Sequence, residues 1–181
     1  MKALLFLAEG FEEIEAISIV DILRRGGVRV ETVSITKEKE VKGAHHIPVV
    51  ADCLLEEINT ETADMLILPG GLPGSTNLNA HEGLKKSLTA HYNNGKYIAA
   101  ICAAPLVFGE LGLLQGKKAV CYPGIEPQLI GATIVDTPVV QDGNIITGKG
   151  PGLAFHFGLK LIALLKGQDK ADEVAAGMLL D

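Results

Sequence analysis

The stretch YIAAICAAP, residues 97–105, joins a short apolar run to a cysteine that small residues follow at once. This pattern predicts a buried strand that turns sharply into a helix, with the thiol of Cys102 at the tip of the turn. A thiolate is favoured beside the free N–H groups that begin a helix, and small neighbours let a substrate approach. A well-packed core cysteine is the alternative, because unpaired cysteine is among the most buried residue types.

Apolar runs and helical periodicities alternate on both sides of this stretch. Strands are expected at residues 2–8, 28–35, 65–68, 97–101 and 119–122, and helices at residues 14–23, 82–93, 104–114 and 153–165. Residues 139–146 predict a hairpin with an Asp-Gly turn, and residues 47–50 a short edge or hairpin strand. The alternation predicts an α/β fold with a doubly wound, mostly parallel sheet and helices on both faces. Because no repeat or linker is present, residues 1–181 are expected to form a single domain.

The composition argues against several classes of partner. The formal net charge is −6 and Lys/Arg clusters do not extend beyond pairs, so neither nucleic acid nor a membrane surface is expected. No apolar stretch approaches the roughly 18 residues of a membrane span, and the first apolar run is too short for a signal peptide. The 3 cysteines have spacings typical of neither a zinc site nor a disulfide framework. A reducing compartment, and hence a cytoplasmic location, is therefore expected.

Three loops follow predicted strands and are expected to meet at the carboxyl edge of the sheet. They are residues 9–15, residues 69–74 and the turn at Cys102. In the first loop, Glu12 and Glu13 are typical of solvated acids that stabilise a helix N-terminus. Glu15 lies inside the helix beside apolar residues. A carboxyl group desolvated there would have a raised pKa and could donate a hydrogen bond to a thiolate; a solvated acid is the alternative.

The Gly70-Gly71 pair has two interpretations. Such glycines form turns, and they also let backbone N–H groups face a ligand oxygen, as in an oxyanion hole. None of the 5 histidines directly follows Cys102, so the residues of a Cys-His hydrolase are not adjacent in sequence. The tandem His45-His46 lacks a further ligand at i+4 spacing, so no metal is expected.

Five segments, taken together and in this order, resemble the ThiJ/PfpI superfamily, most closely its parkinsonism-associated branch and bacterial relatives. They are AEGFEEIEA (8–16), DILRRGG (21–27), ILPGG (67–71), AAICAAP (99–105) and TGKGPG (147–152). The resemblance implies a flavodoxin-like fold, and a homodimer formed through the helix from Glu15 to Arg25. It also implies that Cys102 is the reactive thiol, that Glu15 is its protonated partner, and that the amides of Gly71 and Ala103 are oxyanion donors. No cofactor is expected.

The chain departs from the superfamily pattern near the thiol. Members associated with peptidase activity resemble one another in a histidine directly after the nucleophile, where this chain has Ala103. The parkinsonism-associated branch often has a histidine where this chain has Tyr122, and its basic residue near the site aligns with His45. A mechanism that needs a histidine base is therefore not supported, and Glu15 is left to transfer protons.

The resemblance, with these residues, predicts a cysteine-dependent glyoxalase or deglycase that uses neither metal nor glutathione. Cys102 would attack a small 2-oxoaldehyde such as methylglyoxal and Glu15 would shuttle the proton, giving a 2-hydroxy acid. Release of such an acid from glycated amines is the deglycase activity. The alternative is an oxidative-stress sensor or redox-regulated chaperone in which Cys102 is oxidised. A cysteine peptidase is less favoured, as is thiazole phosphate metabolism, since no P-loop is present.

Overall fold

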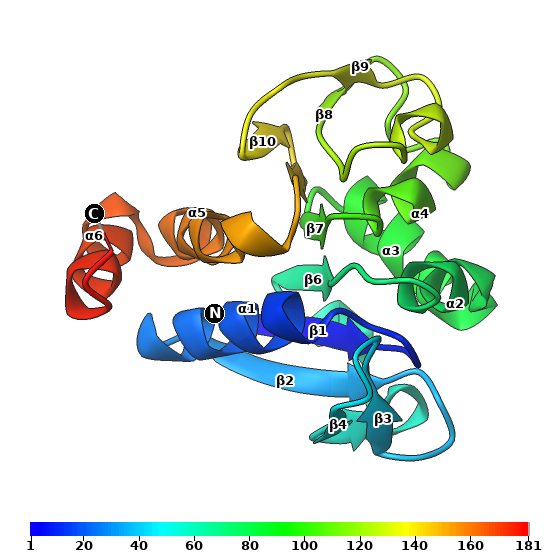
Figure 1. Cartoon of the computed structure of the whole chain (residues 1–181), viewed down its shortest axis with the longest axis horizontal. Coiled ribbons are helices and arrows are strands. Elements are labelled where there is room, and N and C mark those ends of the chain that lie inside the picture. The colour runs from blue at the N-terminus through cyan, green and yellow to red at the C-terminus, as the bar shows by residue number, and fades with distance from the viewer. Residues whose placement is uncertain (181) are drawn as a thin grey trace.

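A mostly parallel sheet forms the centre of the computed structural model, which describes residues 1–180 (Figure 1). Its strand order is β10-β11-β7-β6-β1-β2-β5, and all neighbours are parallel except the β10–β11 hairpin. The strands are β1 (Lys2–Leu7), β2 (Arg29–Ser34), β5 (Cys53–Leu54), β6 (Met65–Leu68), β7 (Tyr97–Ile101), β10 (Val139–Asp142) and β11 (Ile145–Gly148). The predicted α/β fold class is confirmed.

Two groups of helices surround the sheet, one toward the left of Figure 1 and one toward the right. In the first group α1 packs against α5, and α5 packs against α6; in the second, α2 packs against α3 and α4. The helices are α1 (Glu13–Arg25), α2 (Gly74–Ala80), α3 (Glu82–Asn93), α4 (Pro105–Glu110), α5 (Ala154–Lys166) and α6 (Gln168–Gly177). The sequence patterns did not indicate α2, which begins at Gly74, or α6, which follows Gly167.

Smaller elements complete the described chain. A hairpin of β3 (Glu40–Lys42) and β4 (Pro48–Val50) follows β2, and β8 (Lys118–Ala119) pairs with β9 (Thr133–Ile134) in a separate two-stranded sheet. Short 3-10 turns occur at η1 (Leu55–Glu57), η2 (Thr60–Thr62), η3 (Glu126–Gln128) and η4 (Pro151–Leu153). Within residues 1–180, no helix combines the length and the apolar character that a membrane crossing requires.

Two expected elements are shorter than the sequence indicated. The helix expected at 104–114 is α4, which ends at Glu110 because the chain turns at Gly112, whose φ is 71°. The strand expected at 119–122 ends at Ala119. Beyond it the amide of Val120 donates to the side chain of Thr147, and the amide of Tyr122 donates to the carbonyl of Cys102. These bonds replace a strand ladder and hold the segment against the end of β7.

The apolar runs became strands because both faces of the sheet are covered. Residues 3–7 of β1 and all of β6 are buried, as expected for strands with helices on either side. The largest fully buried side chains include Phe6, Phe11, Phe108 and Phe157. This continuous core fixes the strand ends from which the loops of the candidate site extend.

Two substitutions in α3 test which face of this helix packs against the core. Leu88 is fully buried, whereas Lys86 on the same helix is exposed. We expect Leu88→Ala to lower the free energy of unfolding by about 2–5 kcal/mol, because it removes buried methyl groups and leaves a cavity. Lys86→Ala should change it by less than about 0.5 kcal/mol. Urea unfolding of both variants provides the measurement, and equal effects would contradict the assigned face.

Candidate active site

Cys102 lies at a strained turn between β7 and α4. Its φ is 64°, in the left-handed region that side chains other than glycine rarely occupy. Two backbone hydrogen bonds hold the turn: its N–H donates to the carbonyl of Gly148 at 2.9 Å, and its carbonyl accepts from Tyr122 at 2.9 Å. The residue is 8% exposed. A strained strand-to-helix turn of this kind presents its side chain at the edge of a sheet.

Glu15 brings a buried carboxyl group to the same place. Its side chain is fully buried, and Oε2 accepts a hydrogen bond from the amide of Gly70 at 2.7 Å. The carboxyl group also interacts with the side chain of Cys102. Among the described residues, its second oxygen, Oε1, has no hydrogen-bond partner. Burying a carboxyl oxygen without a hydrogen bond costs folding free energy. Such an acid beside a thiol is therefore a candidate for proton transfer.

Close approach at Gly70 makes this arrangement possible. A Cβ atom there would lie 2.6 Å from the Cβ of Cys102 and 2.8 Å from Oε2 of Glu15. Only glycine fits between the acid and the thiol. The three loops expected to converge at the carboxyl edge of the sheet do converge, and the sequence-predicted residues Cys102, Glu15 and Gly70 lie together.

The surroundings of Glu15 and Cys102 raise the pKa of each side chain. Burial raises the pKa of Glu15 to about 7, and the charge of Glu12 acts in the same direction, against the hydrogen bonds from Gly70 and Cys102. Burial raises the pKa of the Cys102 thiol to about 12; the Glu15 carboxylate adds to this, and the amides of Gly71 and Ala103 oppose it. The amides of Gly71 and Ala103 favour the thiolate, but burial and the charge of Glu15 outweigh them. Between about pH 7 and pH 12 the pair therefore holds one proton.

The backbone amides around the sulfur have different roles. Those of Gly71 and Ala103 interact with the side chain of Cys102. The amide of Gly70, which the sequence also suggested for an oxyanion, donates to Glu15 instead. Gly70 therefore holds the acid, and the groups that point toward the sulfur come from Gly71 and Ala103.

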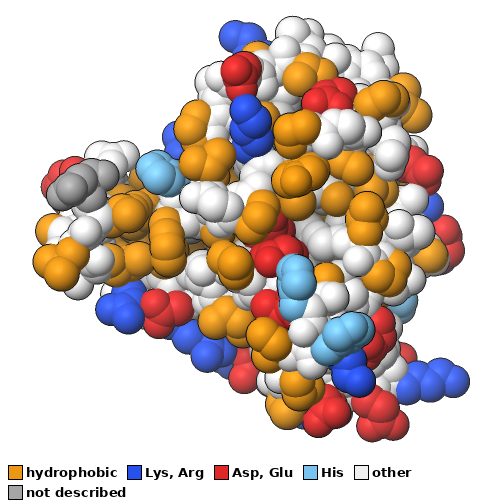
Figure 2. Space-filling view, in the orientation of Figure 1, with side chains coloured by type: hydrophobic (Ala, Val, Ile, Leu, Met, Phe, Trp, Pro, Cys, Tyr) orange, Lys and Arg blue, Asp and Glu red, His pale blue; other side chains and the backbone are white. Residues whose placement is uncertain are grey.

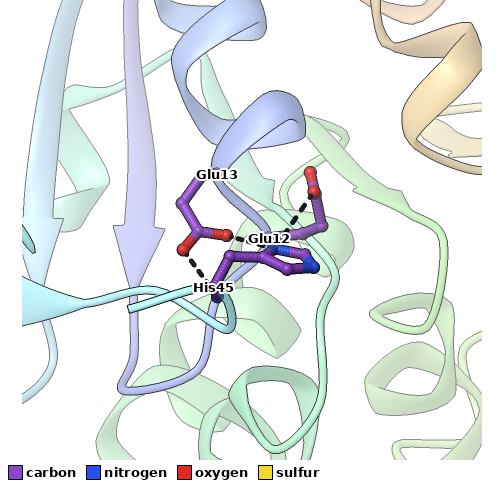
Figure 3. Close-up of side chains that lie close together, drawn as sticks. All are labelled: Glu12, Glu13 and His45. Atoms are coloured by element: carbon purple, nitrogen blue, oxygen red, sulfur yellow. Dashed lines mark hydrogen bonds and ion pairs between the residues drawn. The ribbon is translucent and has the colours of Figure 1, made fainter. Parts of the chain in front are cut away.

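A second cluster at the start of α1 was not foreseen. Loop residues bring His45 to Glu12 and Glu13 (Figure 3): Nδ1 of His45 lies 2.9 Å from Oε2 of Glu13 and 4.0 Å from Oε1 of Glu12. Oε1 of Glu13 accepts the amides of His45 at 2.7 Å and Ile47 at 3.4 Å. The sequence suggested solvated acids, but Glu12 and Glu13 are 7% and 6% exposed. Their contacts with His45 are long-range, so no spacing signal could have revealed them.

The same cluster is where the described chain could best accommodate a cation. One ligand atom from each of Glu12, Glu13 and His45 lies within 4.8 Å of the others. However, Glu13 already accepts hydrogen bonds from the loop and from His45, and Oε2 of Glu12 accepts the amide of Glu15 at 2.7 Å. These hydrogen bonds explain the arrangement without an ion.

Two further histidines, His91 and His156, and the side chain of Tyr122 lie apart from the carboxyl group of Glu15. His91 is buried in α3 and its Nε2 donates to the carbonyl of Ala63 at 3.1 Å, while His156 is exposed on α5. Tyr122 is 49% exposed, and its ring lies over Gly150, where a Cβ atom would approach it to 3.2 Å. None of these three residues interacts with Glu15 within the described chain.

Comparisons with known proteins agree with this geometry. Residues 1–164 match the model of the DJ-1/PfpI family. Protein DJ-1 homolog B of Arabidopsis thaliana is 41% identical over 181 residues, covering 99% of this chain and 41% of that protein, so the chain spans less than half of it. Glutathione-independent glyoxalase DJR-1.2 of Caenorhabditis elegans is 35% identical over 170 residues, covering 92% and 89% of the two chains. The structure of oxidized Toxoplasma gondii DJ-1 superposes with a TM-score of 0.95 at 39% identity, covering 99% of this chain and 98% of that one.

The raised pKa of Glu15 links stability to pH. The folded state binds the proton more tightly than the unfolded state, so the stabilisation is complete below the ordinary value of 4.5 and is lost as pH rises through about 7. Glu15→Gln keeps an oxygen for the amide of Gly70 but cannot ionise. We expect this variant to gain stability over the wild type between pH 4 and pH 8, by up to about 3 kcal/mol.

Urea unfolding of both proteins across this pH range measures the difference. Glu82→Gln, which changes an exposed carboxylate in the first turn of α3, is the matched control and should show little gain. A Glu15→Gln difference that does not vary with pH would show that this acid ionises as readily in the folded protein as in the unfolded chain.

Proposed function

Because this chain belongs to the DJ-1/PfpI family, we propose that it is a cofactor-independent, cysteine-dependent glyoxalase or deglycase that converts 2-oxoaldehydes, or their adducts, to 2-hydroxy acids. The observation that carries the proposal is the buried Glu15, whose pKa is raised to about 7 and whose Oε1 is unpaired within the described chain, beside Cys102. A general acid–base group works best when its pKa lies near the working pH. The printed name of the C. elegans relative, a glutathione-independent glyoxalase, supports the same chemistry.

The first step forms a bond between sulfur and the aldehyde. Glu15, as the carboxylate, takes the thiol proton while Sγ of Cys102 attacks the aldehyde carbon of a compound such as methylglyoxal. The aldehyde oxygen gains negative charge, which the amides of Gly71 and Ala103 are suited to stabilise. Protonation of that oxygen gives a hemithioacetal. The role of Glu15 as base follows from the high pKa of Cys102, about 12, which leaves little free thiolate.

The second step moves hydrogen between two carbons. A base removes the proton from the former aldehyde carbon, and the neighbouring ketone carbon receives a proton, so the first carbon is oxidised and the second is reduced. The product is a thioester of a 2-hydroxy acid on Cys102. Water then breaks the carbon–sulfur bond, releasing the acid and restoring the thiol. Glu15 can serve each proton transfer because its pKa lies near neutrality.

We also propose that the chain acts as a homodimer. Exposed hydrophobic side chains lie on and near α1 and α5, and Figure 2 has a broad apolar area in this part of the surface. They include Ile14, Ile17, Ile47 and Phe155. Contiguous apolar side chains on a protein surface commonly mark an interface. A second copy covering α1 would lie close to the residues that hold Glu15.

Three proteins compared side by side test the catalytic proposal. We expect Cys102→Ser and Glu15→Gln each to reduce lactate formation from methylglyoxal by a factor of about 10² to 10⁴, because the first lacks the thiol and the second cannot accept a proton. Cys53→Ser, at the far edge of the sheet in β5, is the control and should keep wild-type activity. Unchanged lactate formation in Cys102→Ser would refute the proposal.

The relative solved in an oxidized form supports a second candidate, a redox sensor or redox-regulated chaperone. In this role Cys102 would be oxidised to a sulfinate, and the carboxylic acid form of Glu15 would donate a hydrogen bond to it. The same amides that favour an oxyanion would favour the sulfinate oxygens. Both roles use the same thiol and acid, so only a comparison of rates separates them.

Peroxide titration makes this comparison. We expect Cys102 to be oxidised before Cys121, because the Glu15 carboxylate beside Cys102 can take its thiol proton, whereas Cys121 is 3% exposed and no carboxylate is hydrogen-bonded to its sulfur among the described residues. Peptide mass measurement locates the oxygen, with Cys102→Ser as the control. Oxidation at low peroxide together with negligible turnover of 2-oxoaldehydes would favour the sensor; rapid lactate formation that peroxide abolishes would favour the enzyme.

A further inference from the structure

We propose that Glu12 is a positioning residue for Glu15: it holds the acid against Gly70 and Cys102 and places a second carboxylate beside it. The inference rests on the proposed function only through the Cys102–Glu15 pair. It assigns a role to a residue that sequence reasoning treated as a solvated acid.

Three hydrogen bonds link Glu12, Gly70 and Glu15 to one another, and two of them involve Glu12. Its amide donates to the carbonyl of Gly70 at 2.9 Å, its Oε2 accepts the amide of Glu15 at 2.7 Å, and Oε2 of Glu15 accepts the amide of Gly70 at 2.7 Å. Together these bonds form a closed ring through Glu12, Gly70 and Glu15. Glu12 is thus both the N-cap of α1 and the residue that docks the helix onto the loop after β6.

The geometry around this ring leaves little room for adjustment. A Cβ atom at Gly71 would lie 2.5 Å from the amide nitrogen of Glu12, and the side chain of Glu12 is 10% exposed. A charge held in so confined a position acts on its neighbour with little screening by water. Repulsion from Glu12 disfavours ionisation of Glu15, in the same direction as burial.

The charged and titratable groups that face Glu15 are few. Glu12 comes from its own helix, and Cys102 comes from the elbow after β7. The loop after β6 contributes the uncharged amide of Gly70. The loop before β4 contributes His45, which does not touch Glu15 but approaches Glu12 to 4.0 Å and Glu13 to 2.9 Å (Figure 3).

His45 acts as the counter-ion of this arrangement. Its hydrogen bond with Glu13 raises the pKa of its ring, and Glu12 adds to the effect. When protonated, His45 offsets part of the negative charge that Glu12 exerts on Glu15. Removal of Glu12 and removal of His45 are therefore expected to shift the ionisation of Glu15 in opposite directions.

The pH dependence of Cys102 alkylation by iodoacetamide tests the inference, because it reports on the pair without any aldehyde turnover. Wild-type protein should show a rate that rises with pH through a midpoint near 7, where Glu15 ionises. Glu12→Gln keeps an oxygen to cap α1 but removes the charge. We expect its midpoint to fall by about half a pH unit or more, which makes alkylation at pH 6 about 3-fold faster.

Two further variants complete the experiment. His45→Gln should raise the midpoint, and Glu9→Gln, which changes a carboxylate just before α1 that bonds the amide of Lys42, should leave it unchanged. Mass measurement of the peptides distinguishes alkylation of Cys102 from alkylation of the other two cysteines. A midpoint that does not move in Glu12→Gln, or that moves equally in Glu9→Gln, would overturn the inference. If the alkylation midpoint moves in Glu12→Gln but the wild type forms no lactate from methylglyoxal, the role of Glu12 is supported and the proposed enzymatic activity is refuted.

Discussion

The hydrogen bond from the amide of Gly70 to the buried carboxyl group of Glu15 is the interaction on which the site depends. It joins the first helix to the loop after β6, and the other oxygen of the acid has no hydrogen-bond partner within residues 1–180. Glycine is required because any side chain would push the acid and the thiol apart. A single short contact thus couples the packing of α1 on the sheet to the chemistry of the sulfur.

The sheet supplies the second constraint. β7 pairs with β6 on one side and with β11 on the other, so its last residue is fixed in position. The chain can then turn into α4 only through the left-handed conformation at Cys102, which the carbonyl of Gly148 and the amide of Tyr122 hold in place. The strain is maintained by the surrounding hydrogen bonds, and it presents a thiol that is almost entirely enclosed.

Electrostatics determines how such a thiol can react. Burial opposes the charge on both Cys102 and Glu15, and each carboxylate or thiolate opposes the other. The pair therefore titrates as a unit that holds one proton above neutral pH. The amides of Gly71 and Ala103 favour the thiolate, but burial and the nearby Glu15 outweigh them, so the thiol is not ionised by these amides alone. In the proposed mechanism, proton exchange within this pair takes the place of a neighbouring histidine.

The sequence alone determined the α/β class, the positions of β1, β2, β6 and β7, the helix at residues 82–93 and the elbow at Cys102, because these depend on local hydrophobic pattern and on glycine. Family resemblance added the pairing of Cys102 with Glu15. Only the tertiary structure decided that the amide of Gly70 serves the acid, that residues 120–122 leave the strand, and that Glu12, Glu13 and His45 meet. These features join residues tens of positions apart. Their partners, burial and charges exist only once the loops converge at the end of the sheet.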